Sequence, residues 1–171
     1  MIARPETNEF APYYHKYVQL VPDGDILGIL ERQISETTEL LGGLSESKAE
    51  STYEPGKWTI KEVVGHMADT ERVMTFRALW FARNDPNPLP GFEQDDWMRA
   101  ANIGARRFKD LVAELRDVRG ATLPLFRGFD PSTLLRRGTA SGVEFTVRSL
   151  AYIVAGHERH HLNVLRERYL T

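Results

Sequence analysis

The sequence predicts an all-α fold, a four-helix bundle with a long crossover between the second and third helices. Four segments of about 17 to 25 residues repeat apolar side chains every three to four positions, the spacing of one helix face. Between the second and third segments, Pro86, Pro88 and Pro90 interrupt the pattern, so this connection is too long for a simple hairpin. We therefore expect four helices around one core, with a linker that crosses an end of the bundle.

Length and composition restrict the classes of protein that fit. We expect residues 1–171 to form a single domain, large enough to bury a core without disulfides, and the chain contains no cysteine. The 22 basic residues are scattered among 24 acidic ones, which argues against a nucleic-acid partner. No apolar run could cross a membrane, and Met1 to Pro5 do not begin a signal peptide. A cytoplasmic protein without a membrane partner is the expectation.

Residues 1–24 are predicted to form an arm and not a helix, because Pro5, Pro12 and Pro22 interrupt them. Aromatic and apolar side chains give this arm enough surface to lie on the bundle. They are Phe10, Tyr13, Tyr14, Tyr17 and Val18. The arm is expected to cover exposed core, and a position across the mouth of a pocket is the alternative.

The first two helices begin at recognisable caps. Asp25 caps a helix that runs to about Leu41, where two glycines end it. Residues 44–56 form a polar loop with at most a short helical turn. Thr59 and Glu62 have the spacing of a capping box, so the second helix starts there and runs to about Arg83.

In the second half of the chain, one proline interrupts a segment that otherwise has a helical pattern. Residues 84–96 form the linker, which Phe92 and Trp97 anchor, and a third helix follows from about Ala105 to Phe129. Pro124 should kink or end that helix. Residues 134–145 form a loop or short hairpin, and Thr146 caps a last helix that extends to Tyr169.

The last helix carries three of the five histidines within five residues. His157 and His161 lie four residues apart on one face, with Cβ atoms roughly 6 Å apart, so that both imidazoles can bind one ion. Zinc-like ions need at least one more protein ligand. His15 and His66 are the candidates, and His66 is favoured because it lies within a helix.

Two other interpretations of the same histidines remain open. His157, Glu158 and His161 match the His-Glu-x-x-His pattern of zinc proteases, in which the Glu is the general base. No further histidine follows to supply the usual third ligand, and Glu158 points about 100° away from His157 on an ideal helix. A pair of His157 with His160 is also sterically allowed, although His160 is expected to be a polar or interface residue.

These residues resemble the DinB-like superfamily of metal-binding four-helix bundles. The resemblance covers nearly the whole chain and is carried by Trp58 to Glu62 leading to His66 and Asp69, and by Gly156 to Glu158 leading to His161. It implies His66, His157 and His161 as ligands of a divalent metal, zinc or nickel, and a homodimer. Related branches include bacillithiol-dependent S-transferases and mycothiol-dependent maleylpyruvate isomerases, which implies a low-molecular-weight thiol as a cofactor.

A divalent ion with three neutral ligands makes a bound water or thiol lose its proton more easily, with the pKa of water brought to about 7 in the best cases. The function expected is therefore metal-dependent transfer to a small molecule, with a thiol, or hydrolysis of a small molecule. The alternatives are a non-catalytic metal-binding or ligand-binding module and a purely structural bundle.

The sequence gives a weaker signal for the residues that would orient the metal-binding histidines. Each ligating imidazole should donate its other N–H to an acceptor, and Glu62, Asp69, Glu71 and Glu158 are the nearest acids. Glu62 and Asp69, each taken singly, are expected to form ordinary ion pairs with helix neighbours such as Lys61 or Arg72 instead. The pair Arg106 and Arg107 could bind an anionic substrate, but a solvated face is the expectation.

Overall fold

Four long helices form the body of the protein and confirm the predicted all-α, four-helix bundle. The computed structural model describes residues 1–171. The long helices are α2 (Ile26–Gly42), α4 (Ile60–Ala82), α6 (Phe108–Arg127) and α8 (Val147–Val164). The short helices are α1 (His15–Val18), α3 (Glu46–Ala49), α5 (Gln94–Ala100) and α7 (Pro131–Leu134). The hairpin consists of β1 (Arg137–Ala140) and β2 (Val143–Thr146), and a π-helical turn (Leu165–Tyr169) extends α8.

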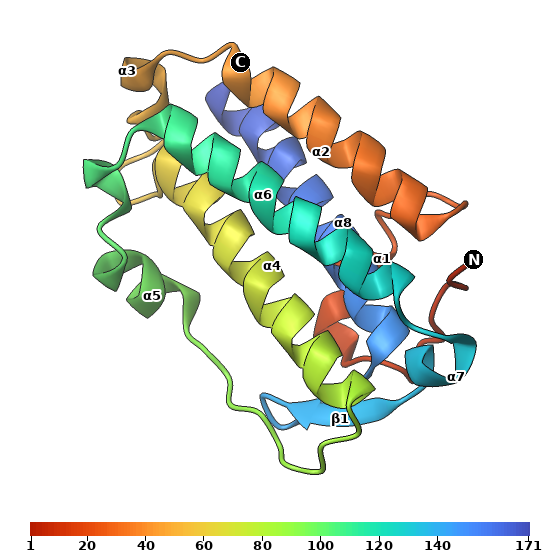
Figure 1. Cartoon of the computed structure of the whole chain (residues 1–171). Helices are drawn as coiled ribbons and strands as arrows, with labels where there is room; N and C mark the ends of the chain where they lie inside the picture. Colours follow the sequence, from red (N-terminus) through yellow and green to blue (C-terminus); the bar gives the residue numbers. More distant parts are fainter.

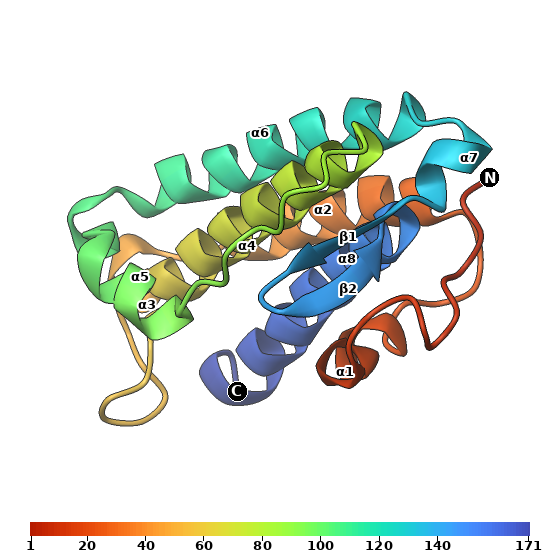
Figure 2. The same ribbon diagram turned by 90° about the horizontal axis from the view of Figure 1, so that it is seen from below.

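The order of the helices around the bundle places α4 beside α8. Helix α4 packs against α6 and α8, and α2 packs against the same two, so α2 and α4 lie diagonally opposite each other. Helix α6 starts at the same end of the bundle as α4, as Figure 1 shows. The segment between them therefore runs back along the bundle, which is the predicted crossover, and Figure 2 shows it passing alongside α4.

The predicted helix starts are confirmed by their caps. The side chain of Asp25 accepts a hydrogen bond from the backbone N–H of Gly28, Thr59 and Glu62 form a capping box, and Thr146 accepts from Ser149. Helix α6 is capped differently, because the carboxylate of Glu46 in α3 accepts from the backbone N–H of Phe108. That cap comes from a distant part of the chain and explains why α6 begins three residues after the predicted start.

Three local features differ from those predicted. The crossover contains a short helix, α5, and Trp97 lies within it with its ring centroid 4.7 Å from that of Phe92. Of the two effects expected of Pro124, the end of the helix does not occur, because α6 continues to Arg127. A proline this close to the helix end removes one backbone bond, and burial of Phe126 on the opposite, core-facing side of the helix compensates for that loss. Residues 12–18 of the arm are helical, as a 3-10 turn (Pro12–Tyr14) followed by α1.

The arm lies on α8 and completes the core there. Its side chains Ile2, Phe10 and Val18 are buried in a hydrophobic cluster with α8, the second half of α4 and the hairpin. A second cluster joins the first half of α4 to α6 and the π-helical turn. No helix combines the length and the apolar character that a membrane crossing requires.

Candidate metal centre

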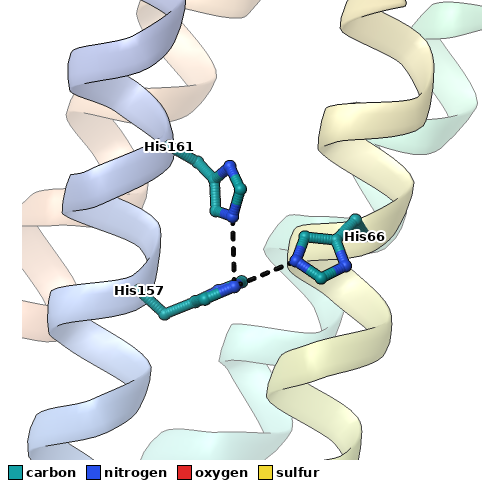
Figure 3. A group of neighbouring side chains, drawn as sticks. All are labelled: His66, His157 and His161. Carbon is teal, nitrogen blue, oxygen red and sulfur yellow. Dashed lines mark hydrogen bonds between the residues drawn. The ribbon is translucent and has the colours of Figure 1, made fainter. Parts of the chain in front are cut away.

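Three of the five histidines converge between α4 and α8. The Nε2 atom of His157 lies 3.0 Å from Nε2 of His66 and 3.1 Å from Nε2 of His161, as Figure 3 shows. One nitrogen from each ring lies within 4.8 Å of the other two. His66 and His157 are buried, and His161 is partly buried. The structure thus brings together the three residues that the sequence singled out.

Local structure explains the convergence. His157 and His161 are one turn apart on the same face of α8, and α4 packs directly against that face. Neighbouring rings then restrict the imidazoles, because the Trp58 ring centroid lies 4.9 Å from that of His66. The ring of Tyr17, in α1, lies 5.4 Å from that of His157.

The three imidazoles are neutral at pH 7. Burial lowers the pKa of His66 to about 4, although the nearby carboxylate of Asp95 opposes this shift. Burial, followed by the repulsion of the neighbouring histidines, lowers the pKa of His157 and of His161 well below its usual value. Neutral rings keep the lone pairs that a metal ion requires.

The donor set fits a metal ion better than it fits hydrogen bonding alone. A neutral imidazole nitrogen carries either one proton or one lone pair. Nε2 of His157 faces two other Nε2 atoms, so a single proton or lone pair cannot serve both neighbours fully. Three imidazole lone pairs directed at one point would suit zinc, nickel, copper or iron.

The other two histidines lie outside this group. His160 is half-buried, with its ring centroid 5.5 Å from that of Tyr17 and 5.1 Å from that of His161. His15 lies in α1 and is not among the converging residues. The pair of His157 with His160 therefore has no support in the geometry.

None of the four nearby acids supports a histidine. Glu62 belongs to the capping box, and Asp69 pairs with Arg72, which is the expected surface pair. Glu71 and Glu158 are buried in the interior of the bundle. Thr70 instead contacts the second ring nitrogen of His66, the one that does not face the other histidines. Its Oγ1 lies 3.5 Å from Nδ1 of His66.

Glu71 and Glu158 meet Arg119 of α6 in the interior of the bundle. Nε and Nη2 of Arg119 donate to Glu71 at 2.7 and 2.8 Å, and Nη2 donates to Glu158 at 2.7 Å. Gln33 and Thr37 of α2 donate to the same carboxylate of Glu158. This carboxylate is held by α2 and α6, which leaves it no role as the general base of a protease motif.

The sequence carried a signal for this network. Arg119, Glu71 and Glu158 each occupy a position within the apolar stripe of their helix, three or four residues from buried apolar side chains. Arg106 and Arg107, by contrast, pair with Glu114 and Asp110 on the surface, as the solvated-face interpretation expects.

Two cavities border the histidine group. One, of about 390 Å³, touches His66 and His157, and the other, of about 310 Å³, touches His160 and His161. Gln94 and Asp95, at the start of α5, line both cavities. Tyr13, Tyr14 and Tyr17 line the first, so the arm both covers core and forms a cavity wall.

Two curated relatives carry names that describe them as metal-dependent. A Geobacillus thermodenitrificans protein named "Putative metal-dependent hydrolase" is 28% identical over 85 residues, which span 48% of each chain. A protein of Geobacillus kaustophilus with a name of the same kind is 22% identical over 129 residues, 74% of this chain and 72% of that protein. The chain thus spans about half the length of the first of these relatives.

Solved structures with the same fold extend the comparison. YfiT from Bacillus subtilis, described as having an unusual four-helix bundle topology, superposes with a TM-score of 0.70 at 17% identity, covering 96% of this chain and 90% of that one. A mycothiol-dependent maleylpyruvate isomerase gives 0.68 at 12% identity, covering 85% and 61%. The family model of the DinB superfamily matches residues 29–165. This match includes all three converging histidines and most of the chain, and the chain therefore belongs to the DinB superfamily.

Proposed function

We propose that the protein is a divalent-metal-dependent enzyme that acts on a small molecule, with His66, His157 and His161 as the metal ligands. The observation that carries the proposal is the convergence of three neutral imidazoles beside two cavities. The group contains no fourth histidine or carboxylate, which supports an open coordination position and weighs against a closed structural site. When bound, the ion would supply Lewis acidity that lowers the pKa of a water or thiol.

Two cavities that contact different histidines of the group favour a reaction between two molecules. We assign one cavity to a low-molecular-weight thiol and the other to an electrophile, which makes an S-transferase the leading candidate. Asp95 lines both cavities and its charge reaches His66, so its carboxylate is placed to accept a proton released by either molecule. The rings of Tyr17 and Trp58 pack against those of His157 and His66 and would hold the two ligands in place.

Hydrolysis is the second candidate, and the names of the two Geobacillus relatives favour it. The same three ligands and the same carboxylate would serve, with water in place of the thiol. A thiol-dependent loss of 1-chloro-2,4-dinitrobenzene would support transfer, whereas thiol-independent release of nitrophenol from 4-nitrophenyl acetate would support hydrolysis.

The family resemblance also suggests the identity of the metal and the oligomeric state. Three imidazole ligands suit zinc or nickel. We further propose one domain over residues 1–171, a homodimer and a cytoplasmic location. Sedimentation velocity of the purified protein would test the dimer.

The deciding experiment is the metal content of untagged protein, measured by mass spectrometry. We expect about one zinc or nickel per chain in the wild type and almost none in a variant with His157→Ala and His161→Ala. His160→Ala is the matched control, because His160 is a histidine of the same helix outside the group, and it should keep the metal. Wild-type protein that contains no metal and takes none up at neutral pH would overturn the proposal.

A further inference from the structure

Thr70 of α4 carries a buried hydroxyl group beside the candidate metal centre. Its exposed fraction is 4%, and it follows His66 by four residues, so the two side chains are neighbours on one face of the helix. Its Oγ1 lies 3.5 Å from Nδ1 of His66, while Nε2 of the same ring faces His157. Thr70 also lines the cavity that touches His66 and His157. The hydroxyl group thus contacts a candidate ligand from outside the group of three histidines.

The orientation of this hydroxyl differs from that of most other threonines in the long helices. A threonine inside a helix can donate to the carbonyl oxygen four residues earlier, and three of the other four threonines in these helices do so. They are Thr38, Thr75 and Thr122, with distances of 2.9, 2.8 and 3.0 Å. Thr70 makes no such bond to the backbone of His66, and the ring of His66 is its polar contact instead.

The position of the protons in this pair follows from the role of His66 as a ligand. A neutral imidazole carries one proton, on one of its two nitrogens. Nε2 of His66 faces His157, so Nε2 is the nitrogen that must keep its lone pair for a shared ion, and Nδ1 then carries the proton. A hydroxyl oxygen accepts a hydrogen bond through its own lone pairs. The Nδ1–H group of His66 therefore has a suitable acceptor in Oγ1 of Thr70.

We propose that Thr70 is a positioning residue, which accepts a hydrogen bond from the Nδ1–H group of His66 and so holds Nε2 towards the ion. Histidines that bind metals commonly donate their other N–H in this way, and the acceptor fixes both the tautomer and the ring orientation. The role rests on the proposed function, because it requires His66 to be a metal ligand.

The neutral charge of this acceptor has a chemical consequence. A carboxylate in the place of Thr70 would make the imidazole a more basic ligand and transfer more electron density to the ion. Glu71, the next residue, is turned away and binds Arg119. With a hydroxyl group as the acceptor, more of the positive charge of the ion remains to lower the pKa of a bound water or thiol.

The test compares the zinc affinity of metal-free wild type and variants by competition with a chromogenic chelator. Thr70→Val keeps the shape of the side chain but removes the hydroxyl, and it should weaken zinc binding by about tenfold or more. Thr70→Ser keeps a hydroxyl and should bind zinc nearly as tightly as the wild type. Thr75→Val is the matched control, because the hydroxyl of Thr75 donates only to backbone carbonyls of α4, and its zinc affinity should be unchanged.

A packing role for Thr70 would give different results. If the side chain only fills space, Thr70→Val would bind zinc as tightly as the wild type. Thr70→Ser, which lacks the methyl group, would otherwise weaken zinc binding as much as Thr70→Val does. Either result would overturn the proposal.

Long-range proton–nitrogen spectra of the zinc-loaded wild type test the same role without relying on a variant. The ring proton of His66 should be on Nδ1, and a proton on Nε2 would overturn the proposal. Wild-type protein that binds no zinc would refute the proposed function together with this role. Zinc binding that Thr70→Val leaves unchanged would refute the role of Thr70 alone.

Discussion

Arg119 is the residue that ties the four long helices together. It extends from α6 to Glu71 of α4 and Glu158 of α8, and its Nη1 also donates to the carbonyl oxygen of Leu30 in α2. Burial alone would lower the pKa of Arg119, but the charges of Glu158 and Glu71 outweigh it and raise the pKa. Arg119 therefore stays charged and neutralises the two buried carboxylates.

Replacement of Arg119 by Met should destabilise the protein by about 3–5 kcal/mol, because both carboxylates would remain buried without a partner. Urea denaturation measures the change. Arg116→Met serves as the control, since Arg116 is exposed and pairs only with the adjacent Asp117, and it should change stability by less than about 0.5 kcal/mol. Equal effects of the two substitutions would show that the buried network contributes little.

Glu9 makes the attachment of the arm dependent on pH. Thr146 and Arg148 of the α8 region each donate to its carboxylate at 2.7 Å. Burial raises the pKa of Glu9, but the hydrogen bonds from Arg148 and Thr146 outweigh burial and lower the pKa to about 2. A carboxylate with a lowered pKa in the folded state stabilises the protein above its unfolded pKa, here 4.5. That contribution is lost as the pH falls towards 2.

Glu9→Gln should therefore reduce the unfolding free energy at pH 7 by up to about 3 kcal/mol and reduce it much less at pH 3. Urea denaturation of both proteins at each pH gives the difference. Glu144→Gln, at an exposed residue that pairs with Arg137, is the control and should show almost no pH-dependent difference. A Glu9→Gln effect that is the same at both pH values would show that Glu9 acts through shape and not through charge.

At the scale of elements, the contact between α1 and α8 depends on one glycine. A Cβ atom at Gly156 would lie 2.1 Å from the carbonyl oxygen of Tyr17 and 2.4 Å from its carbonyl carbon. Backbone atoms cannot move aside as a flexible side chain can. Only glycine at this position lets α1 approach α8 closely enough for Tyr17 to cover His157.

Gly156→Ala should displace α1, lower the unfolding free energy by about 1–3 kcal/mol and make residues 1–21 more sensitive to protease. Gly120→Ala is a matched control in another helix, because a Cβ there meets no atom within 4 Å. Alanine is the better helix former, so Gly120→Ala should raise stability by up to about 1 kcal/mol. Two substitutions of the same kind would then have opposite signs, and a stabilising Gly156→Ala would contradict the close packing.

The sequence predicted those elements whose signals are local. Asp25, Thr59 and Thr146 cap helices whose apolar stripes follow at once, so α2, α4 and α8 were placed within a few residues. Helix α6 was placed less well, because its cap comes from Glu46, 62 residues earlier in the chain. Helix α5 was missed, because its seven residues are too few to show a helical period.

The candidate site also has features that the sequence predicted and features that depend on the packing of the helices. The spacing of His157 and His161 is local to one helix, and His66 could be added only because a second helical pattern contained it. The contacts of Thr70 and Tyr17 with these histidines depend on how the helices pack. One sequence contains no local signal for such contacts between helices.

At the scale of the whole molecule, the proposed metal would join α4 to α8. These are neighbouring helices of the bundle, and their histidines converge only when the helices are packed. An ion that binds the folded protein and not the unfolded chain stabilises the fold by mass action. Metal affinity and folding stability are therefore expected to be linked in this protein.

Zinc added to metal-free wild-type protein at 100 times its dissociation constant should raise the unfolding free energy by about 2.7 kcal/mol. For a chain of this length, the melting temperature should rise by roughly 5–11 °C, since each kcal/mol shifts it by about 2–4 °C. His66→Ala should remove this rise although it leaves both histidines of α8 in place, because an ion held by α8 alone cannot join the two helices. His160→Ala should retain the full rise. Stabilisation that survives His66→Ala would place the ion on α8 alone and contradict a site shared between the two helices.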